Sequence, residues 1–93
     1  MEFLVQTADG ELYDLKAGDL GKAFRPKRLP FHKVEGQGMV RLNVSGSVVE
    51  INDEMGGLQI YFEDEGDHAT ASRIVDSLVE SLIEFTGIQA KNH

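Results

Sequence analysis

Residues 39–63, MVRLNVSGSVVEINDEMGGLQIYFE, decide the fold, because apolar and polar side chains alternate through them in three consecutive segments. The apolar positions of this pattern are Val40, Leu42, Val44, Val49, Ile51, Leu58, Ile60 and Phe62. A period of two places successive side chains on opposite faces of a strand. The connections at 45–46 and 53–57 are too short for the crossovers that parallel strands need. The segment therefore predicts an antiparallel meander of three strands with one apolar and one wetted face.

The first 35 residues predict a second piece of sheet. Phe3, Val5 and Thr7 alternate with their neighbours, Asp9-Gly10 is typical of a type I′ turn, and residues 11–15 continue the pattern, which predicts an N-terminal hairpin. In 16–30 the alternation stops. Two glycines and two prolines there favour either an ordered loop or a single helical turn followed by a loop. Residues 31–35 are a candidate short strand.

A long helix is predicted at the C-terminal end. The apolar residues Ala71, Ile74, Val75, Leu78, Val79, Leu82, Ile83 and Phe85 follow helical spacing, and Ser72, Arg73, Asp76, Ser77, Glu80, Ser81 and Glu84 occupy the complementary face. Asp67 or Thr70 can cap its start, and Gly87 stands where a left-handed terminating residue belongs. The expected fold is α+β: one domain over residues 1–93, with a single antiparallel sheet of five or six strands packed on this helix.

Composition narrows the function classes. The chain has 93 residues, 41% of them hydrophobic and 27% charged, which is typical of a globular domain. It contains no cysteine, so disulfides, thiolate metal sites and cysteine nucleophiles are excluded. No apolar run approaches the roughly 20 residues of a membrane span, and the N-terminus has no secretory pattern. We expect a cytoplasmic protein without membrane contact.

Charge is unevenly distributed along the chain. Residues 1–44 hold seven bases and six acids (net +1), whereas residues 45–93 hold two bases and ten acids (net −8), which together give the net charge of −7. A basic run without acids contains Lys22, Arg25, Lys27, Arg28 and Lys33. An acidic run without bases contains Glu50, Asp53, Glu54, Glu63, Asp64, Glu65 and Asp67. Because a surface of one sign attracts a partner of the other, these runs indicate where partners bind.

Catalytic and metal-binding patterns are missing from the sequence. No serine has the setting of a nucleophile elbow, and His32, His68 and His93 stand in a basic run, a helix lead-in and the terminal position. The acidic stretches 53–64 and 63–74 lack the glycine and glutamate that an EF-hand loop requires at its sixth and twelfth positions. We therefore expect no enzyme activity, no metal and no cofactor.

The second half of the chain, SVVEINDEMGGLQIYFEDEGDHATASRIVDSLVESLIEFTGIQA (residues 47–90), resembles small bacterial immunity proteins of polymorphic toxin systems. The resemblance rests on the order of strand Val48–Asn52, acidic loop Asp53–Gly57, strand Leu58–Glu63 and amphipathic helix Ala71–Gly87. It implies a non-enzymatic inhibitor that occupies a cognate toxin, with the acidic loops as the contact. It assigns no individual functional residue.

The leading expectation is a small acidic binding module that engages a protein with a basic surface, such as a toxin, through Asp53, Glu54, Glu63, Asp64, Glu65 and Asp67. The alternative is nucleic-acid binding by the basic run. Its lysine and arginine residues would contact phosphates, and Phe24 and Phe31, which lie between them in the sequence, would stack on nucleobases. A third hypothesis is self-association through an exposed sheet edge. The acidic run is equally compatible with a face that is charged only for solubility.

Overall fold

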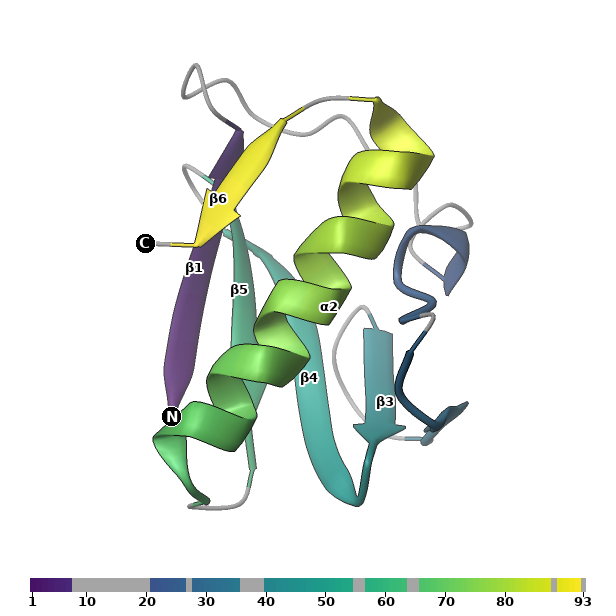
Figure 1. The fold of residues 1–93 in the computed structure, drawn as a ribbon, viewed down its shortest axis with the longest axis vertical. Helices are drawn as coiled ribbons and strands as arrows, with labels where there is room; N and C mark the ends of the chain where they lie inside the picture. The colour runs from purple at the N-terminus through teal and green to yellow at the C-terminus, as the bar shows by residue number, and fades with distance from the viewer. Residues whose placement is uncertain are drawn as a thin grey trace.

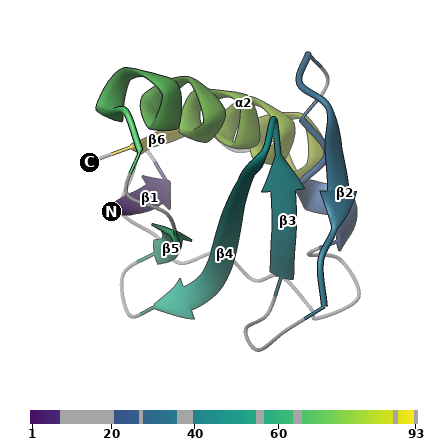
Figure 2. The same ribbon diagram turned by 90° about the horizontal axis from the view of Figure 1, so that it is seen from below.

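The computed structural model describes residues 1–7, 21–26, 28–35, 40–54, 57–63, 66–87 and 89–92. Its elements, in chain order, are β1 (Glu2–Thr7), β2 (Phe31–Lys33), β3 (Val40–Val44), β4 (Ser47–Glu54), β5 (Gly57–Phe62), α2 (His68–Thr86) and β6 (Ala90–Asn92). Residues 21–23 are also helical. Figure 1 shows α2 lying across the strands, and Figure 2 shows that it covers one face of the sheet.

The described strands form one antiparallel sheet in the order β2-β3-β4-β5-β1-β6. The predicted α+β class, the meander and the C-terminal helix are therefore confirmed. β1 does not stand at an edge, because β5 pairs with one side of it and β6 with the other. The predicted N-terminal hairpin is therefore wrong for β1, because β5 and β6 occupy the two sides where residues 11–15 would have paired. Residues 11–15 themselves lie outside the described residues. Residues Ala90–Asn92, for which the sequence analysis predicts no element, add the edge strand β6.

The turn between β3 and β4 shows why the meander has its register. Ser45 and Gly46 both have positive φ, at 52° and 89°, as a two-residue type I′ turn requires. The amide of Gly46 donates to the side-chain oxygen of Asn43 at 2.9 Å. This turn pairs Val44 with Ser47 and then Leu42 with Val49, so the apolar residues of both strands face the same side.

The core lies between the sheet and α2. The inward residues of four strands, β1, β3, β4 and β5, pack on one apolar stripe of α2, and residues 21–25 add two more side chains. The buried apolar side chains are Phe3, Val5, Val40, Leu42, Val44, Val49, Ile51, Leu58, Ile60, Phe62, Ala71, Ile74, Val75, Leu78 and Leu82, with Ala23 and Phe24 from residues 21–25. The rings of Phe3 and Phe62 meet edge to face with centroids 5.7 Å apart. Phe85, which the periodicity assigned to the apolar stripe, is 41% exposed near the end of the helix.

Both ends of α2 follow the sequence signals. The carboxylate of Asp67 accepts from the amide of Thr70 at 3.2 Å, so Asp67 is the N-cap, and the helix begins at His68, three residues before the periodic apolar pattern. Gly87 has φ 72° and donates its amide to the carbonyl of Ile83 at 2.7 Å, which is the bond of an αL termination.

Candidate functional site

The segment before β2 is fixed to the helix by one serine. Ala23 and Phe24 are buried, and the hydroxyl of Ser81 donates to the carbonyl of Ala23 at 2.6 Å and accepts from the amide of Arg25 at 2.8 Å. The periodicity had placed Ser81 on the polar face of the helix, and this assignment is wrong, because Ser81 is only 7% exposed. A small hydroxyl can be buried where the backbone of a neighbouring segment satisfies both its donor and its acceptor.

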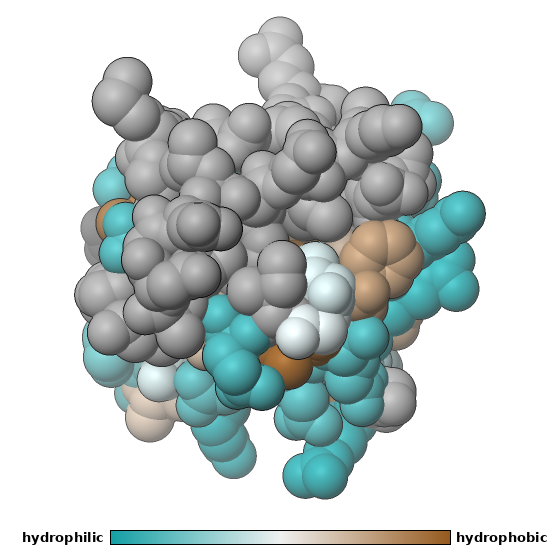
Figure 3. Space-filling view, turned by 90° about the horizontal axis from the view of Figure 1, so that it is seen from above, coloured by the Kyte–Doolittle hydropathy of each residue, from teal (hydrophilic) through white to brown (hydrophobic). Residues whose placement is uncertain are grey.

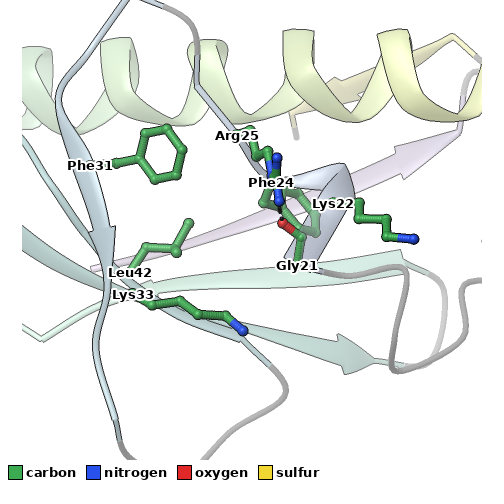
Figure 4. A pocket seen from close by; sticks show the side chains of 7 residues that line it. All are labelled: Gly21, Lys22, Phe24, Arg25, Phe31, Lys33 and Leu42. Atoms are coloured by element: carbon green, nitrogen blue, oxygen red, sulfur yellow. Dashed lines mark hydrogen bonds between the residues drawn. The ribbon is translucent and has the colours of Figure 1, made fainter.

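Beside this segment lies an open hollow of about 420 Å³, which is within the size range of ligand clefts. The described residues that line it are Gly21, Lys22, Phe24, Arg25, Phe31, Lys33 and Leu42. Figure 4 shows that the hollow lies between β2 on one side and residues 21–25 on the other. Phe24 and Leu42 are almost fully buried and form its apolar floor, whereas Phe31 is 39% exposed at its wall.

The register of β2 explains why two of its side chains enter the hollow. Phe31 pairs with Val44 and Lys33 pairs with Leu42, and both of these partners are buried on the helix side of the sheet. Cross-strand neighbours point to the same face, so Phe31 and Lys33 also lie on the helix side, while His32 points to the other face. All three residues of β2 are exposed, on both faces of the strand.

Two cationic side chains converge at Gly21. The Nε of Arg25 donates to the carbonyl of Gly21 at 3.4 Å. The ammonium nitrogen of Lys33 lies 3.8 Å from the position that a Cβ on Gly21 would occupy. The ion pair among the described residues joins Arg41 to Glu63, elsewhere in the molecule. Neither Arg25 nor Lys33 therefore forms an ion pair with a described acid. In Figure 4 the third cation, Lys22, directs its ammonium away from β2, so it lies at the rim.

The structure therefore gathers part of the basic run. Lys22, Arg25 and Lys33 line one hollow, together with Phe31 and Phe24, the two rings that the sequence interleaves with the bases. Arg28 is exposed and lines a different hollow, where Asp76 and Glu80 of α2 also lie. Lys27 lies outside the described residues. The sequence does not mark Gly21, Leu42 or Ser81 as part of this site. Leu42 comes from β3 and Ser81 from α2, and no local pattern shows that either residue meets the basic run.

The acidic run is less concentrated in the described part of the chain. Glu63 forms its ion pair with Arg41, whose guanidinium also donates to the carbonyl of Glu35 at 3.1 Å. Asp67 is used as the cap of α2. Asp53 and Glu54 belong to β4, where they pair with Leu58 and Gly57, but their side chains lie outside what is described. Asp64 and Glu65 are also outside it. The described members thus do not form one unpaired acidic surface.

Asp67 carries a pH-dependent share of the stability. The hydroxyl and then the amide of Thr70 bond to its carboxylate, which holds the pKa of Asp67 below its ordinary value. A pKa lowered in the folded state means that the carboxylate stabilises the fold above its unfolded-state pKa and loses this effect as the pH falls through the folded value.

We expect Asp67→Ala to be less stable than the native chain at neutral pH, with a gap in unfolding free energy that narrows as the pH falls below the ordinary aspartate pKa of 3.8. Urea unfolding at neutral pH and at a series of lower pH values measures this. Asp67→Asn is the matched control, because an amide cap keeps the acceptor and carries no charge, and its gap should change little with pH. A gap for Asp67→Ala that is constant with pH would show that the charge of the cap contributes nothing.

On the face that Figure 3 shows, the described apolar residues are exposed only as small areas among hydrophilic side chains. The described residues include no group of three or more histidine, aspartate or glutamate side chains arranged to hold a metal ion. Among them, no helix has the length and apolar character that crossing a membrane requires. No protein-family model, curated protein or solved structure matches the chain.

Proposed function

We propose that this chain is a non-enzymatic binding module for another protein, and that an acidic segment of that protein binds in the basic hollow. The observation that carries the proposal is the convergence of Arg25 and Lys33 at Gly21 without a described counter-ion. Both cations line the same hollow, so a carboxylate that enters it can accept charge-assisted hydrogen bonds from them.

The lining of the hollow also favours a ligand that carries an apolar group beside its anionic group. Phe24 and Leu42 supply an apolar floor, and the half-exposed ring of Phe31 forms a wall next to Lys33. A protein segment that carries an acidic side chain and an apolar side chain near each other matches both features. Aromatic and arginine side chains around a partly enclosed pocket are also the groups that contribute most to protein interfaces.

Single-stranded nucleic acid is the second candidate for the same hollow, because an exposed ring next to cations can stack on a base and contact its phosphate. The net charge of −7 repels any anion, but it repels a nucleic acid more than a short acidic segment, because a nucleic acid carries a charge on every nucleotide. If Lys22, Arg25 and Lys33 all met phosphates, log K would fall with log salt at a slope of about −2.

The acidic run and the immunity role remain predictions with less structural support. A basic partner would have to displace the ion pair of Glu63 with Arg41 or compete for the cap at Asp67. What still favours such a partner is the net −8 of residues 45–93 against the net +1 of residues 1–44. A toxin as the partner is implied by the resemblance alone.

The test uses a fluorescein-labelled peptide of alternating glutamate and threonine with one central leucine, and measures its affinity by anisotropy. We expect Arg25→Glu combined with Lys33→Glu to weaken binding at least about tenfold, because charge-assisted hydrogen bonds contribute roughly 1.5 kcal/mol or more each. Arg73→Glu, which reverses an exposed charge on α2, is the matched control and should change the affinity by less than about twofold.

Oligodeoxythymidine is measured beside the peptide with the same variants. Tighter binding of the oligonucleotide than of the peptide, with the salt slope given above, would favour the second candidate. If neither probe binds, or if the double variant binds the peptide as the native chain does, the basic hollow is not the contact. Circular dichroism of each variant confirms that the fold is retained.

A further inference from the structure

We infer that the acidic segment binds as an additional β-strand along β2, so that its backbone pairs with Phe31 and Lys33 while its side chains enter the basic hollow. This inference rests on the proposed function and names how the partner is recognised. β2 is an edge of the sheet, since β3 is its one neighbour among the described strands. An edge strand presents backbone donors and acceptors that a second chain can use.

The hydrogen bonds between β2 and β3 identify which groups are available. The carbonyl of Pro30 accepts from Ser45 at 2.8 Å, and the amide of Val34 donates to Arg41 at 3.0 Å. Backbone groups alternate in direction along an antiparallel strand, so residues 30, 32 and 34 bond towards β3. The amides and carbonyls of Phe31 and Lys33 therefore point to the outer side of β2, away from the sheet.

The same two residues place their side chains in the hollow. A strand added beside β2 would have every second side chain on the helix side, next to Phe31 and Lys33. Those side chains would reach the cations Arg25 and Lys33 and the apolar floor at Leu42. The geometry thus favours a partner whose acidic and apolar residues alternate with residues of any kind, rather than one in which they are contiguous.

Charge also decides against a second copy of the chain as the occupant. Two β2 strands paired edge to edge would bring two copies of Lys33 and two of Arg25 to one seam, with no described acid between them. Lysine on an edge strand is a common means of preventing such pairing. An acidic strand turns the same repulsion into attraction, so the partner differs from this chain in the sign of its charge.

Amide hydrogen exchange of the native chain gives the first test, with the alternating peptide as the probe. In the free chain we expect the amides of Phe31 and Lys33 to exchange faster than those of Val34 and Ser45, which bond across the β2–β3 pair. Saturation with the peptide should slow Phe31 and Lys33 at least about tenfold. Unchanged exchange at both residues under saturation would overturn the inference.

Two substitutions separate the backbone contact from the charge. Lys33→Thr removes the ammonium and keeps the amide, whereas Lys33→Pro removes the outward amide as well without breaking a bond to β3. We expect Lys33→Pro to bind the peptide at least about fivefold more weakly than Lys33→Thr, and a peptide with alternate N-methylated amides to bind at least about tenfold more weakly than the unmodified one. Sedimentation analysis of each variant confirms that it is monomeric and folded.

The outcomes distinguish the inference from the proposed function. Salt-sensitive binding that depends on Arg25 but is equal for the methylated and unmodified peptides would leave the hollow as the contact and overturn strand addition. Equal binding by the alternating peptide and by a peptide of the same composition with contiguous glutamates would overturn it as well. Failure of the native chain to bind any of these peptides would overturn both strand addition and the proposed function. Dimer formation by the native chain without peptide would show that a second copy occupies the edge.

Discussion

Gly57→Ala is expected to destabilise the fold by about 3 kcal/mol or more, since overpacking against a fixed backbone is among the costliest single changes. A Cβ at this position would lie 2.3 Å from the carbonyl oxygen of Val5 and 3.2 Å from its carbonyl carbon. The backbone of Val5 has little freedom to move, because it pairs with Leu58 of β5 on one side and with Asn92 of β6 on the other. Relief of the clash would therefore open β1 from its neighbours.

Urea unfolding measures this effect, and Gly66→Ala is the matched control. Nothing lies within 4 Å of the Cβ position of Gly66, so the same substitution should leave stability unchanged or raise it by about 0.5 kcal/mol through the entropy of the unfolded chain. Stability of Gly57→Ala within about 0.5 kcal/mol of the native chain would show that β1 and β5 do not approach as closely as described.

Phe24→Ala is expected to cost about 3–5 kcal/mol, the range for removing a buried aromatic side chain. Phe24 is 1% exposed, and it belongs to the short segment that Ser81 holds against α2. Loss of the ring removes the floor of the basic hollow and the main apolar anchor of residues 21–25. Arg25 would then no longer be held beside Lys33, so affinity for the acidic peptide should fall together with stability.

Phe85→Ala is the control for the loss of a phenyl ring, because that side chain is 41% exposed and its removal should cost less than about 1 kcal/mol. Phe24→Leu separates the two roles of the ring, since it keeps most of the buried volume and should retain most of the stability. Equal destabilisation by Phe24→Ala and Phe85→Ala in urea would contradict the burial of Phe24. Unchanged peptide affinity in a folded Phe24→Ala chain would contradict its role in the hollow.

Much of the fold could be predicted from the sequence, because it follows from local periodicity. The alternation of Leu42 and Val44 with polar residues specified two faces of a strand, and the Ser45-Gly46 turn specified antiparallel pairing. Asp67 and Gly87 marked the two ends of the helix by side-chain chemistry and by tolerance of positive φ. These signals act over a few residues, and tertiary contacts reinforced them rather than opposing them.

The candidate site could be predicted only in part, because it depends on which distant segments come together. The sequence identified the run from Lys22 to Lys33 as basic and aromatic, yet only the pairing of β2 with β3 turned Lys33 towards Arg25. The sequence also predicted Glu63 as a partner-binding acid, equal to the other members of the acidic run. In the structure Glu63 forms an ion pair with Arg41, which lies 22 positions away in the chain. Charge along a sequence does not say which charges meet in space.

The three-stranded meander and the terminal helix thus follow from short segments of the sequence, because period, turn residues and caps are local properties. Packing of distant segments places β1 between β5 and β6, buries Ser81 against Ala23 and Arg25, and brings Arg25 and Lys33 to one hollow. The physical reason is that these contacts join residues far apart in the chain, and their free energy depends on the packing of the whole core.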